Sequence, residues 1–194
     1  MLNLANKLSI FRILLIPLFV TTIIYYTPEK DFLRLAAVGI FLLAIFSDAL
    51  DGYIARVKGE RTRLGTFLDP LADKLLLITV FICLSIVKTL PPEFKLAPWI
   101  VIIVISRDAI IVSGSAIIFM ASGKLNVSPT TLGKITTSLQ MATVLAVLLQ
   151  LKIFSPIMYT MIFFTVLSGL DYIRIGSRLF NGTPPVKYNR GVGC

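Results

Sequence analysis

The chain has 194 residues, of which 56% are hydrophobic and 15% are charged, and its mean hydropathy is +0.88. This composition excludes an ordinary soluble domain and is typical of a protein that crosses a membrane several times. The sequence contains no histidine, which excludes histidine-based zinc sites and Ser-His-Asp triads. The net charge of +9 indicates contacts with lipid headgroups, and we expect no nucleic-acid partner.

Six apolar segments are each long enough to cross a hydrocarbon core of about 30 Å. In chain order they cover residues 10–26, 32–55, 64–87, 97–121, 132–151 and 155–175. A short amphipathic helix over residues 2–9 is expected to lie at the membrane interface before the first span. The sequence therefore predicts an all-α polytopic membrane protein with six transmembrane helices. Its membrane domain covers residues 1–180, and residues 181–194 are expected to form a loosely ordered cytoplasmic tail.

Basic residues indicate the orientation of these spans. Two groups stand out, one between the second and third spans and one around the end of the last span: Arg56, Lys58, Arg61 and Arg63, and then Arg174, Arg178, Lys187 and Arg190. By the positive-inside rule both groups belong on the cytoplasmic side. Six spans then leave both termini in the cytoplasm. We expect an integral protein of the cell inner membrane whose active site opens to the cytoplasm.

Four aspartates lie in the second and third spans, within the stretch SDALDGYIARVKGERTRLGTFLDPLADKLLL: Asp48, Asp51, Asp69 and Asp73. A carboxylate near the bilayer centre costs roughly 2.5–3.5 kcal/mol on insertion scales, so these acids need a cationic partner. Asp48 and Asp73 lie at matching distances from the connecting turn, about 12 Å along each helix. Asp51 and Asp69 match each other in the same way. A helical hairpin is therefore expected to gather all four acids into one cluster.

The composition of this cluster favours a hard divalent cation. Oxygen ligands without histidine or thiolate suit Mg²⁺ or Mn²⁺, and four carboxylates are enough to hold two such ions. The alternative is that the acids form intramembrane ion pairs with Arg56, Lys74 or Arg107, which would only hold helices together. Small residues are expected to keep the helix faces beside the cluster bare, namely Gly52, Ala55 and Gly65.

Eight of these positions, at their fixed spacing, resemble the complete signature of the CDP-alcohol phosphatidyltransferases: Asp48, Asp51, Gly52, Ala55, Arg56, Gly65, Asp69 and Asp73. The six-span layout extends the resemblance over nearly the whole chain. It implies transfer of a phosphatidyl group from CDP-diacylglycerol to an alcohol, with release of CMP and with two metal ions held by the four aspartates. The resemblance also implies that Asp73 is the general base on the acceptor hydroxyl. The implied CDP-diacylglycerol site contains Gly52, Ala55, Arg56 and Gly65.

The beginning of the chain carries a second part of the resemblance. The run from Asn6 to Arg12 resembles the Asn, Thr, Arg pattern at the start of these enzymes, with Ser9 in the place of the threonine. Asn6 is expected either to help bind CDP-diacylglycerol or to cap the first helix.

The acceptor alcohol is indicated by two cations in the second half of the chain. Arg107 and Asp108 interrupt the apolar fourth span, and Lys134 lies at the head of the fifth. Arg107 either compensates Asp108 or binds a phosphate group together with Lys134. The second interpretation favours glycerol 3-phosphate as the acceptor, which would give phosphatidylglycerophosphate. The run 133–137 with Gln140 also resembles the corresponding stretch of phosphatidylglycerophosphate synthases, except at Thr136, where a second lysine is usual.

Other acceptors and other functions remain open. Asp108 stands where those synthases commonly have glutamate, and its surroundings also resemble cardiolipin synthases, so phosphatidylglycerol is the alternative acceptor. Inositol phosphate is a third, whereas Arg107 and Lys134 would repel cationic ethanolamine or choline. A cation transporter would belong to another class, but it does not require the set of Gly52, Ala55, Arg56 and Gly65. A noncatalytic membrane scaffold would explain neither the cluster of acids nor its spacing. The expected partners are CDP-diacylglycerol, glycerol 3-phosphate and membrane lipids, and small residues on the spans permit a homodimer.

Overall fold

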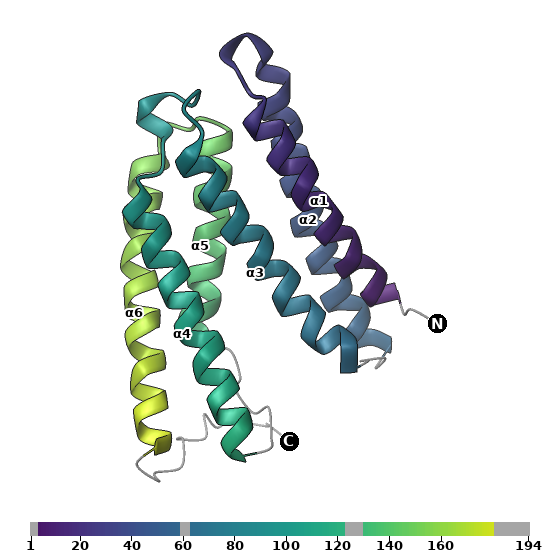
Figure 1. Cartoon of the computed structure of the whole chain (residues 1–194), viewed down its shortest axis with the longest axis vertical. Coiled ribbons are helices and arrows are strands. Elements are labelled where there is room, and N and C mark those ends of the chain that lie inside the picture. Colours follow the sequence, from purple (N-terminus) through teal and green to yellow (C-terminus); the bar gives the residue numbers. More distant parts are fainter. Residues whose placement is uncertain (1–3, 59–62, 123–129, 181–194) are drawn as a thin grey trace, which may run out of the picture.

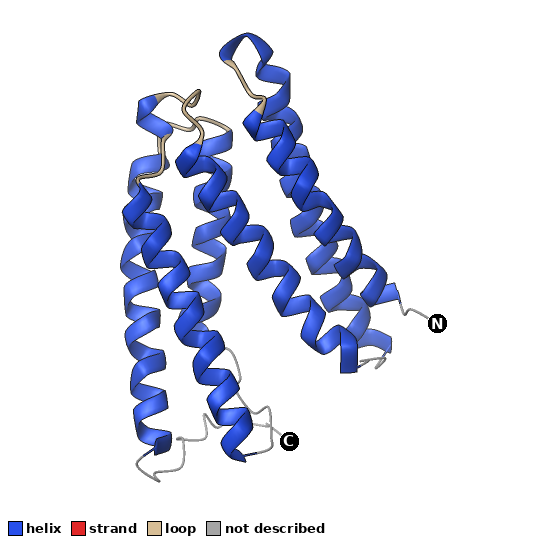
Figure 2. Cartoon of the chain, viewed as in Figure 1, coloured by secondary structure: helices blue, strands red, loops and turns tan. Residues whose placement is uncertain are grey.

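A computed structural model describes residues 4–58, 63–122 and 130–180 of the chain, and the side chains of residues 7–50, 72–113 and 130–174. Within these residues the regular structure is helical (Figure 2). The six long helices are α1 (Leu4–Ile24), α2 (Asp31–Lys58), α3 (Arg63–Ile86), α4 (Pro98–Ser122), α5 (Thr131–Leu148) and α6 (Phe154–Phe180). Each expected span therefore corresponds to one helix, and the class of fold is confirmed as all-α.

Five of the described helices are long and apolar enough to cross a membrane: α1, α2, α4, α5 and α6. The remaining helix, α3, has 24 residues and carries Asp69, Asp73 and Lys74 in its first half. The helices thus indicate a membrane protein, whereas the exact number of six spans stays a prediction.

The start of α1 differs from the expectation for residues 2–9. In the described part of the chain, no separate amphipathic helix precedes the first span, because α1 continues without a break from Leu4 to Ile24. The sequence has neither proline nor glycine before Pro17 to interrupt it. Ser9 and Arg12 are also fully buried, so one face of this part of the helix packs against the rest of the protein.

The helices form two groups that α3 connects (Figure 1). In the first group α1 packs against α2 and α3, and in the second both α4 and α5 pack against α6. Apolar side chains fill the contacts within each group, as where the rings of Phe19 and Phe41 lie 6.3 Å apart between α1 and α2. Figure 1 also shows that α1 begins and α6 ends at the same end of the bundle, where α2 ends and α3 begins. Which side of a membrane this end faces stays a prediction.

The opposite end of the bundle contains a backbone conformation that favours glycine. Gln150, just after α5, has a φ of 51°. There the amide of Leu151 donates a hydrogen bond of 2.9 Å to the carbonyl oxygen of Ala146, which satisfies one terminal carbonyl group of the helix. Arg34 of α2 donates a 2.6 Å hydrogen bond to the carbonyl oxygen of Leu148, so the same helix end is tied to the first group of helices.

We expect Gln150→Gly to increase the free energy of unfolding by about 0.5–1 kcal/mol, because glycine adopts a positive φ without the clash of a Cβ atom. Thermal unfolding of the detergent-solubilised protein would measure the gain. Leu149→Gly is the matched control, since Leu149 has a φ of −86° and should lose stability on the same substitution. A Gln150→Gly variant that unfolds at a lower temperature than the parent would contradict this expectation.

Candidate active site

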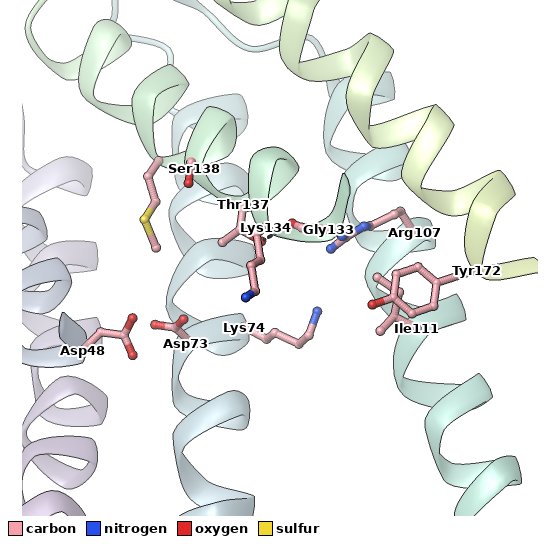
Figure 3. A pocket seen from close by; sticks show the side chains of 11 residues that line it. Asp48, Asp73, Lys74, Arg107, Ile111, Gly133, Lys134, Thr137, Ser138 and Tyr172 are labelled. Atoms are coloured by element: carbon pink, nitrogen blue, oxygen red, sulfur yellow. Dashed lines mark hydrogen bonds between the residues drawn. The ribbon is translucent and has the colours of Figure 1, made fainter. Parts of the chain in front are cut away.

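A cavity of about 430 Å³ lies among α2, α3, α4, α5 and α6. Its charged lining is divided into two sides (Figure 3). The acidic side contains Asp48 of α2 and Asp73 of α3. The basic side contains Lys74 of α3, Arg107 of α4 and Lys134 of α5. Residues far apart in the sequence therefore place negative and positive charges around one space.

The two acids share a buried cation. Their carboxylates point toward one another in Figure 3, and each contacts the guanidinium of Arg12 of α1. Arg12 Nη2 lies 3.2 Å from Asp48 Oδ1, and Nη1 lies 3.5 Å from Asp73 Oδ1. The Arg12 side chain is 0% exposed, against 38% for Asp48 and 25% for Asp73. Because Arg12 does not line the cavity, it neutralises the acids from the side that faces the protein interior.

Arg12 is a site residue that the sequence reasoning quoted as part of a motif without giving it a role. Its Nε also donates a 3.4 Å hydrogen bond to Ser47 Oγ, next to Asp48 in α2. The signal in the sequence was a lone charged residue within the apolar segment 10–26. In the structure Ser9 and Leu15, three residues to either side, are both buried. A cation on the buried face of a helix needs a carboxylate partner nearby.

The two described acids of the acidic side fit a hard divalent cation. Asp48 and Asp73 offer oxygen atoms that are close together and partly open to the cavity, and oxygen is the donor that Mg²⁺ and Mn²⁺ prefer. Asp51 and Asp69 lie three residues after Asp48 and four before Asp73, on the same helix faces, although their side chains fall outside the described residues. The set of four metal ligands therefore stays a prediction.

The basic side contains a network of hydrogen bonds around the buried Asp108. Lys74 Nζ lies 2.9 Å and Arg107 Nη1 lies 2.6 Å from the same oxygen, Asp108 Oδ1. Arg107 also donates a 3.0 Å hydrogen bond from Nη2 to Ser168 Oγ of α6. The two sequence-based interpretations of Arg107 are thus compatible, because this residue pairs with Asp108 and also lines the cavity.

Gly133 allows the start of α5 to approach Arg107 closely. A Cβ atom at this position would lie only 3.2 Å from Arg107 Nη2 and 3.3 Å from Thr130 Oγ1. Thr130 caps the helix by accepting a 3.1 Å hydrogen bond from the amide of Gly133. The capped first turn therefore places Gly133 against the guanidinium and Lys134 at the cavity.

Thr136, the departure noted in the sequence, has a structural role. It is fully buried, and its hydroxyl lies 2.8 Å from the carbonyl oxygen of Leu132 and 3.1 Å from that of Phe164 in α6. This position packs α5 against α6 and does not line the cavity.

Several predicted site residues have side chains outside the described part of the chain. They are Asn6, Asp51, Gly52, Ala55, Arg56, Gly65 and Asp69. Their backbones belong to α1, α2 and α3, and their proposed contacts with metal ions or CDP-diacylglycerol stay predictions.

Comparisons with known proteins give a family match and several similar relatives. The sequence model of a family described as CDP-alcohol phosphatidyltransferase matches residues 2–167. A relative from Bacillus subtilis (strain 168), named CDP-diacylglycerol–glycerol-3-phosphate 3-phosphatidyltransferase, is 36% identical over 192 residues, which cover 89% of this chain and 94% of the relative. A relative of the same name from Blochmanniella floridana is 32% identical, with 88% and 89% covered. A probable phosphatidylglycerophosphate synthase of Mycobacterium tuberculosis (strain ATCC 25618 / H37Rv) is 30% identical, with 93% and 84% covered.

Proposed function

The chain belongs to the CDP-alcohol phosphatidyltransferase family, and on this basis we propose that it transfers the phosphatidyl group of CDP-diacylglycerol to glycerol 3-phosphate. The products are phosphatidylglycerophosphate and CMP. The observation that carries the proposal for this chain is a cavity with two acids on one side and three cations on the other. Such a site can activate a hydroxyl and bind a phosphate in the same acceptor molecule.

The charges on the basic side favour a phosphate monoester as the acceptor. Lys74, Arg107 and Lys134 outnumber Asp108, so this side keeps an excess of positive charge. A phosphate monoester carries about −1.5 to −2 charges near pH 7, whereas a phosphodiester such as phosphatidylglycerol carries about one. Glycerol 3-phosphate therefore matches the excess charge better than phosphatidylglycerol does.

The acidic side supplies the proton acceptor for the transfer. Asp73 takes the proton of the acceptor hydroxyl. The oxygen of that hydroxyl forms a bond to the phosphatidyl phosphorus, and the bond from the phosphorus to the oxygen of CMP breaks. Arg12 contacts both carboxylates and so keeps Asp48 and Asp73 side by side before substrate binds. Two divalent ions held by the four aspartates would neutralise the charge that develops on the departing CMP. In this proposal the cavity opens toward the cytoplasm, where the water-soluble acceptor is found.

An acceptor panel tests the proposed function. The purified protein would receive CDP-diacylglycerol and Mg²⁺ with glycerol 3-phosphate, phosphatidylglycerol or inositol phosphate, and mass spectrometry would identify the lipid product. We expect phosphatidylglycerophosphate and an equal amount of CMP with glycerol 3-phosphate, and no product when EDTA removes the metal. Formation of cardiolipin from phosphatidylglycerol without use of glycerol 3-phosphate would overturn the proposal.

The contribution of Lys134 to acceptor binding can be measured separately. We expect Lys134→Gln to raise the KM for glycerol 3-phosphate about 10- to 100-fold, since a lost hydrogen bond to a charged group costs about 1.5–3 kcal/mol. The KM for CDP-diacylglycerol should change less than about threefold, because that substrate is bound by other residues. Lys152→Gln, at an exposed lysine beyond the other end of α5, is the control. An equal rise of both KM values would exclude a specific contact with the acceptor.

A further inference from the structure

Lys74 is a cation of the cavity to which the sequence motifs assign no part in substrate binding. It follows Asp73 directly in α3, and both side chains line the cavity. Consecutive helical residues point about 100° apart. In Figure 3 the carboxylate of Asp73 accordingly points to Asp48, whereas the ammonium of Lys74 extends to the basic side.

The surroundings of Lys74 hold its ammonium in place without removing it from the cavity. Its Nζ lies 2.9 Å from Asp108 Oδ1, and Asp108 is 5% exposed, whereas the Lys74 side chain is 29% exposed. Asp108 does not line the cavity, so it contacts Lys74 from the interior. This arrangement fixes a lysine at the wall of the cavity, where its side chain stays partly exposed.

Neutralisation of Asp108 does not by itself explain Lys74. Arg107 Nη1 already lies 2.6 Å from the same carboxylate oxygen, closer than Lys74 Nζ. One buried acid with two cations leaves an excess of positive charge on this side of the cavity, and a bound anion would compensate it. The cavity is the place where that anion can bind.

We propose that Lys74 is a third cation of the acceptor-phosphate site, together with Arg107 and Lys134, and that it fixes the phosphate relative to Asp73. The inference deepens the proposed function and rests on it. Three helices then contribute one cation each: α3, α4 and α5. Because Lys74 and Asp73 are neighbours on one rigid helix, a phosphate on the lysine places the hydroxyl of the same molecule toward the carboxylate.

Lys74→Met tests this assignment, since methionine keeps the unbranched shape and removes the charge. We expect the KM for glycerol 3-phosphate to rise about 10- to 100-fold, and the KM for CDP-diacylglycerol to change less than about threefold. Inorganic phosphate should inhibit the parent competitively against glycerol 3-phosphate, and its inhibition constant should rise by a similar factor in Lys74→Met. Lys74→Arg, which keeps the charge, should retain most of the affinity for glycerol 3-phosphate and for inorganic phosphate. Lys88→Met, at an exposed lysine after the other end of α3, is the control.

The alternative is that Lys74 only stabilises Asp108. It predicts a lower unfolding temperature for Lys74→Met with unchanged KM and inhibition constants, and that result in folded protein would overturn the proposal. If Lys74→Met does not fold, the double variant Lys74→Met/Asp108→Asn removes both charges of the pair, and the same rise in KM is expected there. If the parent protein uses glycerol 3-phosphate and the Lys74 variants bind it normally, only this inference is contradicted. A parent that does not use glycerol 3-phosphate contradicts the proposed function itself.

Discussion

Asp73→Asn is expected to lower kcat by a factor of about 10²–10⁴, the contribution typical of a general base. The amide is almost isosteric with the carboxylate but cannot accept the proton of the acceptor hydroxyl. Because Asp48 and the rest of the cavity are unchanged, the affinity for CDP-diacylglycerol should remain within about threefold of the parent value. Turnover with both substrates saturating, together with direct binding of CDP-diacylglycerol, would measure the two quantities.

Asp31→Asn provides a matched control for this experiment. Asp31 is also an ion-paired aspartate, 2.6 Å from Arg34 Nε, but it lies at the first turn of α2, away from the cavity. The Asp31→Asn variant should therefore have the same kcat as the parent. Near-normal turnover of Asp73→Asn would remove Asp73 from the role of base.

Arg12→Gln is expected to have the largest effect on stability. It leaves the Asp48 and Asp73 carboxylates facing each other without their shared cation. Since both acids are partly exposed, we expect a loss of about 2–3 kcal/mol, below the 3–5 kcal/mol typical of a fully buried pair. This corresponds to a decrease of roughly 4–12 °C in unfolding temperature for a chain of this size. Arg12→Lys should lose less, although one ammonium cannot match the two-point contact of a guanidinium.

The effect of Mg²⁺ on the unfolding temperature shows whether Arg12 acts as a counter-charge to the two acids or has only a structural role. In the absence of Arg12, a bound cation replaces the missing positive charge, so Mg²⁺ should raise the unfolding temperature of Arg12→Gln more than that of the parent. Arg174→Gln, at an exposed arginine of α6, serves as the control and should show the response of the parent. An identical Mg²⁺-induced shift in Arg12→Gln and the parent would contradict the role of Arg12 as counter-charge.

The helices were predictable because their signal is local. The expected fourth span, 97–121, corresponds to α4 at Pro98–Ser122, since both the apolar run and the proline are visible in the sequence. The second span was expected to end at residue 55, but α2 continues to Lys58. There the end of the apolar run is not the end of the helix, because charged residues can extend a helix beyond the hydrocarbon core.

The ion pairs of the site were harder to predict because they depend on helix packing. Asp48 and Asp73 were expected to lie at equal depth, and the structure places both at one cavity. Their cation comes from α1, whose rotation against α2 and α3 is set by many apolar contacts that no local pattern describes. Likewise, the sequence showed Arg107 beside Asp108, but only packing of α3 against α4 brings Lys74 to the same carboxylate.

The position of Arg12 in the first helix also bears on how the protein is made. Chains are synthesised from the N-terminus, so α1 leaves the ribosome before α2 and α3. The guanidinium is therefore already present when Asp48, and later Asp73, emerge and have to be accommodated at the membrane. Each acid can meet its counter-ion in the order in which the residues are translated, before any metal has been acquired.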